Sequence, residues 1–231
     1  MFIIGHRGAA GLAPENTILG IKTAVENRAD AIEFDVRVTA DKKLVLCHDD
    51  TFLRIAGKSD RVRDLSLNQI RKIETNSGEP IPTLEEAIKA AGKTPLVIEG
   101  KSDDWARPLA NILKTHKTES PRVISYNHRE LFLFSELMPG IDTFAIENHH
   151  PIEAMLLAKN LRFTGVSLAA WLYNPIVYHL SKKYKLELIT SPLNPRWRIR
   201  LFHFLYPRAM ITTDFPDRVI NHNLRRRRKR K

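Results

Sequence analysis

The chain has a single cysteine, no glycine-rich phosphate loop and no long apolar run. Cys47 has no second cysteine to pair with, which excludes an internal disulfide, and its place at the end of an apolar stretch predicts a buried small side chain. The most apolar window, 164–180, is interrupted by polar residues and is shorter than the roughly 20 residues of a membrane-spanning helix. We interpret this window as part of a protein core.

The chain also lacks a secretory signal pattern and an internal linker. Its first apolar run, 1–4, is short and leads directly into a His-Arg pair, whereas a signal has a charged segment followed by a longer apolar one. We therefore expect a cytoplasmic protein. No Gly/Ser-rich or Pro-rich stretch divides the 231 residues, so we expect one domain over residues 1–224.

Positive charge is concentrated at one end of the chain. The formal net charge is +11, and the seven basic residues of 225–231 leave only +4 for the rest. A block of like charges repels itself, so we expect 225–231 to be a disordered basic tail. For this tail we predict a weak, nonspecific contact with anionic lipid or nucleic acid, with improved solubility as the simpler alternative.

Most of the chain alternates between short apolar strands and segments with helical spacing of apolar residues. After an opening strand that ends at His6, further strands are predicted at 31–38, 44–47, 95–101, 122–126, 141–146, 163–168, 186–190 and 209–213. Helices are predicted at 18–25, 83–92, 103–116, 128–137, 151–159, 175–184, 196–205 and from Pro216.

This alternation makes eight strand-helix units of roughly 25 residues each, which predicts an α/β fold of the (β/α)₈ TIM-barrel type. A doubly wound open sheet is the main alternative. It usually has a Gly-rich phosphate loop after the first strand, and this sequence has neither G-x-G-x-x-G nor a Walker motif. The alternation is broken at 51–82, a charged segment with several Gly and Pro residues. We interpret 51–82 as a small insertion after the second strand that lies over the barrel mouth.

The strand 31–38 carries acids on one face only. It alternates strictly, so that Glu33, Asp35 and Arg37 share one side and apolar residues share the other. In a closed barrel the polar side faces inward, where bare carboxylates are costly unless they bind a metal or another cation. The acids on this strand therefore favour a cation site.

The carboxyl ends of barrel strands converge on one face, where barrel enzymes carry their chemistry. Seven ionisable residues are expected there: His6, Arg7, Glu33, Asp35, His48, Glu99 and Lys101. Three carboxylates form an all-oxygen site that suits Mg²⁺ or Ca²⁺ better than zinc. Two histidines beside it can serve as general acid and base, and Arg7 and Lys101 can neutralise a phosphate. Each residue alone has an ordinary structural interpretation; the grouping favours an active site.

A series of motifs in this order resembles the glycerophosphodiester phosphodiesterase family. The match extends from near Met1 to about Pro216, and the series as a whole is highly specific. The motifs are His6-Arg7-Gly8, Pro14-Glu15-Asn16-Thr17, Ile32-Glu33-Phe34-Asp35-Val36, His48-Asp49, Thr83-Leu84-Glu85-Glu86, Ile98-Glu99-Gly100-Lys101 and Thr213-Asp214-Phe215-Pro216.

The resemblance implies a metal-dependent hydrolase that converts glycerophosphodiesters to sn-glycerol 3-phosphate and an alcohol. It implies a divalent cation, Mg²⁺ or Ca²⁺, on the three acids, an acid-base pair of histidines, and the two basic residues on the substrate phosphate. Asp214, by contrast, is expected to cap the last helix. The implied site consists of His6 and His48 as catalytic residues, Arg7 and Lys101 at the phosphate, and Glu33, Asp35 and Glu99 at the metal.

The sequence departs from the family in one stretch. Many members have a Trp-Thr-Val-Asn-like segment where this chain has Ile-Thr-Ser-Pro-Leu-Asn at 189–194, followed by a basic and aromatic stretch at 196–206. The ordinary interpretation of 196–206 is an outer barrel helix; the alternative is a lip that rests on a lipid surface. This departure and the basic tail keep open a lysophospholipase D-like enzyme at a membrane surface. A catalytically silent protein that binds nucleic acid through its tail is a separate alternative, against which the intact ionisable residues argue: His6, His48, Glu33, Asp35 and Glu99.

Overall fold

The computed structural model describes residues 1–219. Within this range eight parallel strands form one sheet in the order β8-β7-β6-β5-β4-β2-β1-β9, and an additional strand, β3, pairs with β2. The predicted tail at 225–231 and the last residues of the predicted domain lie outside the described residues. The parallel strands are β1 (Ile3–Gly5), β2 (Ala31–Val38), β4 (Leu96–Gly100), β5 (Arg122–Ser125), β6 (Asp142–Glu147), β7 (Gly165–Leu168), β8 (Glu187–Thr190) and β9 (Ile211–Thr213).

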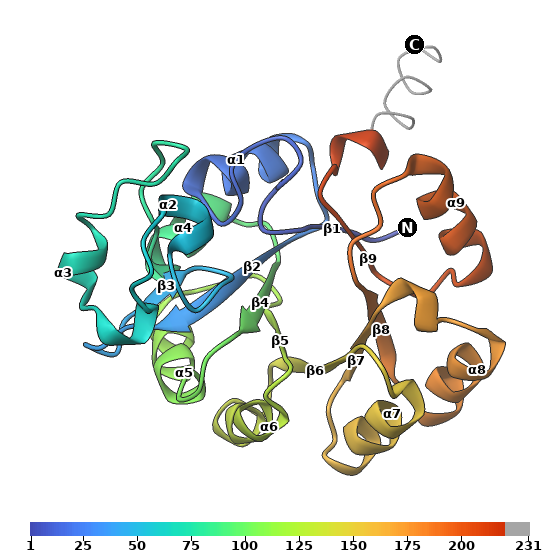
Figure 1. Ribbon diagram of the computed structural model, residues 1–231. Helices are drawn as coiled ribbons and strands as arrows, with labels where there is room; N and C mark the ends of the chain where they lie inside the picture. Colours follow the sequence, from blue (N-terminus) through green and yellow to red (C-terminus); the bar gives the residue numbers. More distant parts are fainter. Residues whose placement is uncertain (220–231) are drawn as a thin grey trace.

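The sheet closes on itself between β8 and β9. Ile189 and Met210 form a parallel bridge, and the Met210 amide donates to the Leu188 carbonyl at 2.8 Å. With the pairing of β1 to β9, this closure makes the sheet a barrel, and Figure 1 shows the strands in the centre with helices around them. The (β/α)₈ prediction is confirmed.

Helices cover the outside of the barrel between successive strands (Figure 1). Thr83 and Glu86 form the predicted capping box, in which each side chain accepts a hydrogen bond from the other residue's amide. The helices are α1 (Ile18–Glu26), α4 (Leu84–Ala91), α5 (Ala106–Thr115), α6 (His128–Leu137), α7 (Pro151–Asn160), α8 (Pro175–Tyr184) and α9 (Arg196–Leu205), with a short 3₁₀ turn η2 (Ala170–Leu172).

Two of the predicted helix starts are displaced. The helix predicted from residue 103 begins at Ala106, because Asp104 has a φ of 59°, a left-handed conformation that an α-helix cannot include. The helix predicted from Pro216 is helical at 217–219 within the described residues.

The barrel has an apolar core on each side of its wall, one outside and one inside. A large outer cluster packs helices against the barrel wall, and a smaller cluster fills the inside of the barrel at its amino-terminal end. On β2 and β4 the inward-facing residues change from apolar to acidic toward the carboxyl ends, so the acids stand on an apolar floor. This floor consists of Ile4, Ala31, Val97, Ile124, Phe144, Ile146, Ile189 and Met210.

The segment 51–82 has more local structure than its sequence predicts. It follows β3 (Leu44–Leu46), which is antiparallel to β2, and contains α2 (Leu53–Ala56), the 3₁₀ turn η1 (Val62–Asp64) and α3 (Leu67–Ile70). These short elements are held by a separate apolar cluster that includes Cys47, which is buried as predicted. Burial raises the pKa of the Cys47 thiol to about 12, which makes a reactive thiolate unfavourable.

Candidate active site

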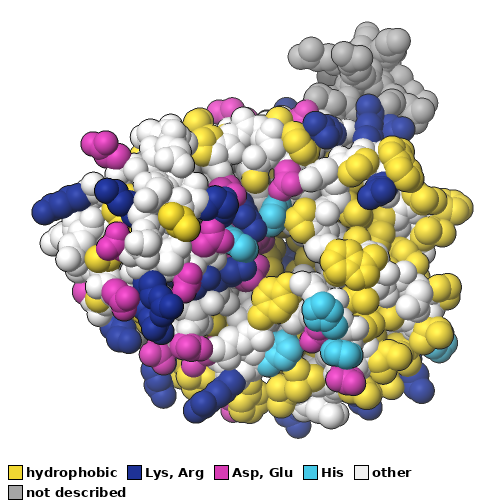
Figure 2. All heavy atoms as spheres, in the orientation of Figure 1, with side chains coloured by type: hydrophobic (Ala, Val, Ile, Leu, Met, Phe, Trp, Pro, Cys, Tyr) yellow, Lys and Arg dark blue, Asp and Glu magenta, His cyan; other side chains and the backbone are white. Residues whose placement is uncertain are grey.

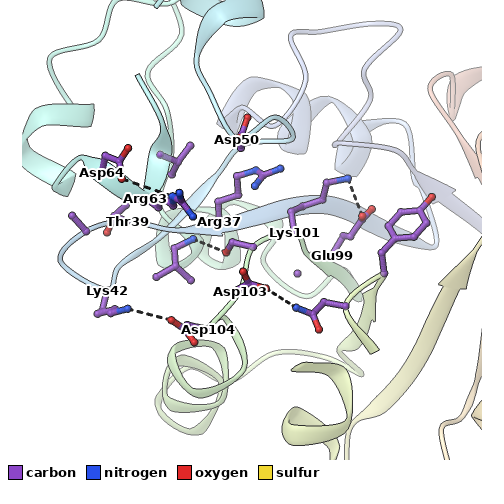
Figure 3. A pocket seen from close by; sticks show the side chains of 17 residues that line it. Arg37, Thr39, Lys42, Asp50, Arg63, Asp64, Glu99, Lys101, Asp103 and Asp104 are labelled. Atoms are coloured by element: carbon purple, nitrogen blue, oxygen red, sulfur yellow. Dashed lines mark hydrogen bonds and ion pairs between the residues drawn. The ribbon is translucent and has the colours of Figure 1, made fainter. Parts of the chain in front are cut away.

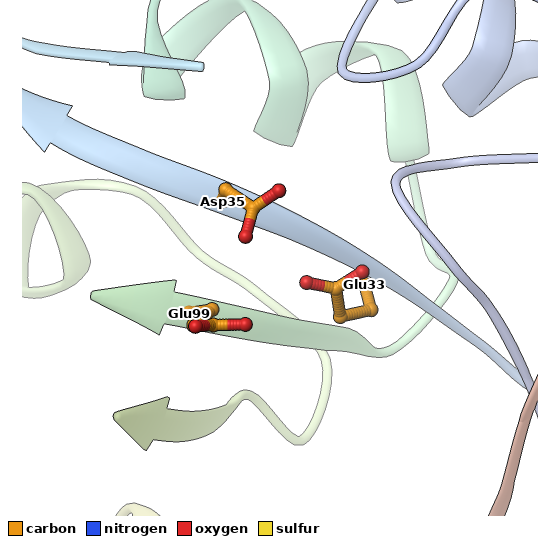
Figure 4. A group of neighbouring side chains, drawn as sticks. All are labelled: Glu33, Asp35 and Glu99. Carbon is orange, nitrogen blue, oxygen red and sulfur yellow. The ribbon is translucent and has the colours of Figure 1, made fainter. Parts of the chain in front are cut away.

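Three carboxylates meet at the carboxyl end of β2 and β4. Asp35 and Glu99 are register partners on these neighbouring strands, and Glu33 lies one inward position below Asp35. One oxygen from each acid lies within 4.8 Å of the others, and Figure 4 shows the three side chains converging between the strands. The strict alternation of β2 therefore places its acids on the inside of the barrel.

The two glutamates hold their protons more tightly than free glutamates do. Burial raises the pKa of Glu33 well above its usual range, and the charges of Asp35 and Glu99 raise it further. Burial and the charge of Asp35 raise the pKa of Glu99 to about 7, against the opposing effect of Lys101. In the absence of a further cation, this cluster does not hold three full negative charges at neutral pH.

Asp35 is the most strongly held of the three acids. It is 1% exposed, and Asn16 donates its side-chain amide to Asp35 Oδ2 at 2.9 Å. Burial opposes ionisation of Asp35, but Lys101 and Arg7 outweigh it and lower its pKa. Asn16 adopts a φ of 54°, which turns the chain sharply and aims its amide at Asp35, while Thr17 caps α1.

These acids fit a hard divalent cation. The donors are all carboxylate oxygens, the type that Mg²⁺ and Ca²⁺ prefer. Glu33 Oε1 is buried and accepts no hydrogen bond among the described residues, a condition that a bound cation would satisfy. Glu33, Asp35 and Glu99 are accordingly the residues of the described chain that suit the implied metal.

His6 enters the cavity at the end of β1 with its ring oriented by an acid. Its Nδ1 lies 2.6 Å from Asp214 Oδ1, and its Nε2 lies 4.0 Å from Glu33 Oε2. Asn194 donates to the other oxygen of Asp214 at 2.5 Å. The expectation that Asp214 caps the last helix is wrong, because both of its oxygens are directed to the site and the helical residues begin only at 217.

His48 has a similar arrangement just after β3, and it lines the same cavity. Its Nδ1 lies 2.7 Å from Asp49 Oδ1, and Arg54 of α2 donates to Asp49 Oδ2 at 2.7 Å. Burial lowers the pKa of His48 in spite of Asp35 and Asp49, so its ring is neutral at pH 7 and can accept a proton. The hairpin of β2 and β3 is what returns the chain to the cavity at this point.

Two basic residues, Arg7 and Lys101, form ion pairs with the acids. Arg7 Nε lies 3.3 Å from Asp35 and Arg7 Nη1 donates to Glu15, while Lys101 Nζ lies 2.9 Å from Glu99 and 3.6 Å from Asp35. The chain turns sharply after Arg7 and packs closely against α1. Gly8 allows this turn, because its φ is 87° and a Cβ there would collide with the backbone of Gly20. The Arg7 amide also donates to Glu33 at 2.8 Å.

Two cavities flank Lys101. A cavity of about 370 Å³ is lined by all the predicted site residues except the deeply buried Asp35, together with Tyr126 and Trp171 on its far side. A larger cavity of about 680 Å³ lies toward the insertion and shares Glu99, Lys101 and Tyr126 with the first. Figure 3 shows this second cavity, in which the Lys42–Asp104 and Lys101–Glu99 pairs occupy its walls. The chemistry-bearing groups thus face the smaller cavity.

Comparison with known proteins agrees with this geometry. The family model "Glycerophosphoryl diester phosphodiesterase family" matches residues 6–160, which include all seven predicted site residues. The chain belongs to this family. The remaining third of the barrel, which contributes Asp214, lies outside the matched range.

Relatives with assigned names extend the match. A glycerophosphodiester phosphodiesterase from Caldanaerobacter subterraneus subsp. tengcongensis is 32% identical over 189 residues, 75% of this chain and 77% of that protein. The Bacillus subtilis protein YhdW is 36% identical over 159 residues, and the aligned part spans 63% of this chain and 65% of YhdW. The chain therefore spans about two thirds to three quarters of the length of these relatives.

Solved structures share the fold. A phosphodiesterase from Oleispira antarctica, in complex with the product sn-glycerol-3-phosphate, superposes with a TM-score of 0.84 at 22% identity and covers 95% of each chain. A glycerophosphodiester phosphodiesterase from Agrobacterium tumefaciens gives a TM-score of 0.80 at 22% identity, covering 96% of this chain and 99% of that one. Both show the same barrel.

The predicted site residues therefore come together in one place, but several of their partners were not predicted. Asp214 is 208 residues from His6, and no local pattern connects the two. Arg54 and Glu15 join through two hydrogen bonds of 2.7 and 2.9 Å, which also lack a local signal. The adjacency of Asp49 to His48 was a usable signal, since an acid beside a histidine commonly orients its ring.

Proposed function

We propose that the protein hydrolyses glycerophosphodiesters to sn-glycerol 3-phosphate and an alcohol by acid-base catalysis with His6 and His48. The observation that carries this proposal is the single cavity that combines a buried acidic cluster, two acid-oriented histidines and two basic residues. Family membership supports the same reaction class. The cytoplasmic location and the exact residue roles remain predictions from the sequence.

In this proposal the two histidines move the protons. With Nδ1 of each ring against a carboxylate, Nε2 is the nitrogen left to exchange a proton with substrate. One ring removes the proton of the attacking hydroxyl, and the other protonates the oxygen of the departing alcohol. The neutral ring of His48 suits the base.

The acids and bases of the site bind the diester. Glu33, Asp35 and Glu99 would hold a divalent cation, which when bound supplies positive charge against a phosphate oxygen. Ion pairs with Asp35 and Glu99 hold Arg7 and Lys101 beside the proposed cation site. There their positive charges can neutralise the remaining negative charge of the phosphate. The cation is proposed as Mg²⁺ or Ca²⁺ on the basis of the all-oxygen ligand set.

Two nucleophiles fit this arrangement: a water molecule, or the glycerol 2-hydroxyl, which would first form a cyclic phosphate that water then opens. Phosphorus NMR of the reaction distinguishes them. A cyclic phosphate signal that rises and then decays identifies the internal route, and its absence throughout turnover identifies direct attack by water.

The decisive test is release of glycerol 3-phosphate from glycerophosphocholine by the purified protein. We expect activity that EDTA abolishes and that Mg²⁺, Ca²⁺ or Mn²⁺ restores. Glu99→Gln should regain part of its activity at high metal concentration, while His48→Ala should lose turnover and still bind metal. Loss of activity in both variants that metal does not change would contradict these roles, and no turnover with any ion would contradict the reaction.

A second candidate is the same cleavage of a lysophospholipid, as in a lysophospholipase D. The exposed Trp171 at the edge of the cavity favours it, because an aromatic side chain there can contact an acyl chain. Comparison of lysophosphatidylcholine with glycerophosphocholine on anionic vesicles tests this candidate. Equal or slower cleavage of the lysophospholipid would eliminate it.

A further inference from the structure

The surface around the cavity mouth has two unlike halves. Figure 2 shows charged side chains crowded over the insertion on the left and hydrophobic side chains gathered on the right, over α7, α8 and α9. Contiguous exposed apolar surface on a protein usually marks an interaction site. We name the six largest exposed members near η2, α8 and α9 the apolar rim: Trp171, Ile176, Trp197, Leu201, Phe204 and Leu205.

Helix α9 is apolar on two opposite sides. Its inner side buries Ile199 and Phe202 against the barrel, as an outer barrel helix requires. Its outer side presents the four rim residues 197, 201, 204 and 205, which helical spacing places on one stripe. Within residues 1–219 this stripe is exposed, with Trp197 at 62% and Phe204 at 82%. Packing of the barrel does not account for it.

Arginines border this stripe. Arg196, Arg198 and Arg200 are all exposed, and they occupy the beginning of α9, where the first turn has no acidic residue. Positive charge at a helix amino terminus opposes the helix dipole and destabilises the helix locally. Side chains that break a local rule in this way are expected where a function needs them. Arginines beside exposed aromatic residues suit an anionic, partly apolar surface.

The apolar rim reaches the cavity. Trp171 is 74% exposed and also lines the cavity that contains His6 and Glu33. Ile176 and Trp197 stand in the first turns of the helices that follow β7 and β8, so both lie at the barrel end where the strands deliver the site. Trp171, Ile176 and Trp197 thus lie at the end of the barrel that holds the cavity entrance. The other rim residues continue the apolar surface along α9 away from it: Leu201, Phe204 and Leu205.

We propose that the apolar rim docks onto an anionic phospholipid surface and turns the cavity mouth toward it. The exposed tryptophans would enter the interface between headgroups and acyl chains, and the arginines of α9 would pair with anionic headgroups. Docking itself is independent of the proposed hydrolysis, whereas delivery of a lipid-bearing diester to the site rests on the proposed function.

Intrinsic fluorescence gives the first test, since the three tryptophans differ in position. Trp105 is fully buried, whereas Trp171 and Trp197 belong to the rim. With the full chain we expect a blue shift, and quenching by brominated lipid, on vesicles of phosphatidylcholine with phosphatidylglycerol. Pure phosphatidylcholine vesicles should give a much smaller change, and added salt should weaken the effect. No change on the anionic vesicles overturns the proposal.

Variants identify the surface. In vesicle co-sedimentation, Trp197→Ala combined with Phe204→Ala should weaken binding about tenfold or more, because apolar area is removed from the contact. Leu53→Ala, at another exposed apolar residue on α2, should bind as the parent does. Arg198→Gln and Arg200→Gln should each lower affinity for anionic vesicles roughly fivefold. These variants retain the basic tail, so any loss reports on the rim.

The remaining outcomes separate this proposal from its rivals. Undiminished binding by the Trp197→Ala, Phe204→Ala variant overturns it and assigns vesicle binding to another part of the chain. A dimer in light scattering that the same substitutions dissociate assigns the rim to a second copy instead. Glu99→Gln should dock normally, so failure of hydrolysis and failure of docking are read separately.

Discussion

Each histidine of the site depends on a carboxylate that fixes its ring. His6 lies 2.6 Å from Asp214 and His48 lies 2.7 Å from Asp49, through Nδ1 in both cases. Because these acids contact Nδ1 and leave Nε2 to the proposed substrate, we propose that they position the histidines and do not exchange protons with substrate. The candidate site therefore combines two histidine-acid pairs with a carboxylate cluster in one cavity.

Asp214→Asn should lower kcat about 10- to 100-fold, as is typical when a residue that orients a site ligand is changed. The amide cannot stabilise the charged imidazole that proton transfer creates, so the pH profile of kcat should shift as well. Asp60→Asn, at an exposed acid of the insertion, serves as the matched control and should leave kcat unchanged. Equal effects of the two substitutions would contradict a positioning role.

Glu99 makes the metal-free protein sensitive to pH. Its pKa rises from 4.5 to about 7 on folding, so it stabilises the fold fully below about pH 4.5, and this contribution is lost as pH rises through 7. Urea unfolding in EDTA should show wild type losing stability relative to Glu99→Gln over this window, by at most about 1.4 kcal/mol per pH unit. A difference that does not vary with pH would be inconsistent with this pKa.

The sequence alone placed all seven predicted ionisable residues at one end of the barrel, because strand alternation and strand order determine which side chains face that end. It could not place their partners. Asp214 resembled a helix cap locally, and only closure of the barrel brings it to His6. Glu15 and Arg54 meet across 39 residues through a segment whose path has no periodic pattern.

Arg54 links the insertion to the candidate site through hydrogen bonds of its side chain. Arg54 of α2 donates to Asp49 and to both oxygens of Glu15, and Glu15 also accepts from Arg7. A continuous line of ion pairs therefore runs from the partner of His48 to the proposed phosphate-binding arginine. Through Arg54, the proposed insertion thereby orients Asp49 beside His48 and Glu15 beside Arg7.

Arg54→Gln should reduce kcat/KM about tenfold, because Asp49 and Glu15 lose the group that orients them. Its effect on the free energy of unfolding should stay within about 1 kcal/mol, since Arg54 is half-exposed. Arg61→Gln is the matched control: Arg61 lies in the same insertion and contacts only Asp50, at 3.8 Å, among the ion pairs of the described residues. A large loss of stability in Arg54→Gln with unchanged kinetics would reverse this interpretation.

Thr83→Ala removes one half of the capping box at the start of α4, and we expect the free energy of unfolding to fall by about 1 kcal/mol. Thr83 does not line the cavity that contains the acids, so kcat and KM should not change. Thermal unfolding together with the glycerophosphocholine assay checks both statements, and a changed kcat would show that α4 contributes to the site.

Element boundaries followed the sequence closely where a cap or strand alternation marked them, as at Thr83 and along β2. They deviated where backbone conformation decided, as at Asp104, whose positive φ has no reliable sequence signal. The short helices of the insertion were missed because a helix of four residues has no periodicity to detect.

A bound cation should stabilise the whole barrel, because it would link β2 to β4 and relieve repulsion among three buried acids. Ligand binding to the native state alone stabilises it by about 2.7 kcal/mol at a free concentration one hundred times Kd. For a chain of this size that corresponds to a rise in Tm of roughly 5 to 10 °C. Scanning calorimetry with EDTA, and then with Mg²⁺ or Ca²⁺, measures this rise in Tm. Identical Tm values in all conditions would contradict cation binding by the native protein.

No helix within residues 1–219 has the length and apolar character needed to cross a bilayer. The apolar 164–180 window instead spans β7, η2 and the first turns of α8, where Leu168 and Val177 are buried in the barrel wall. The window is therefore mainly part of the barrel wall, as predicted, and its exposed residues are Trp171, Asn174, Pro175, Ile176 and His179.

The pairing of β1 with β9 has a consequence for synthesis of the chain. His6 is synthesised 208 residues before Asp214, which directly follows the strand that pairs with β1 and closes the barrel. At about 5 to 20 residues per second this interval lasts roughly 10 to 40 seconds on the ribosome. From the synthesis of Lys101 until that of Asp214, the nascent chain contains all seven predicted site residues but lacks the acid that lies beside His6. The proposed site is therefore complete only once β9 has been inserted beside β1 and Asp214 lies against His6.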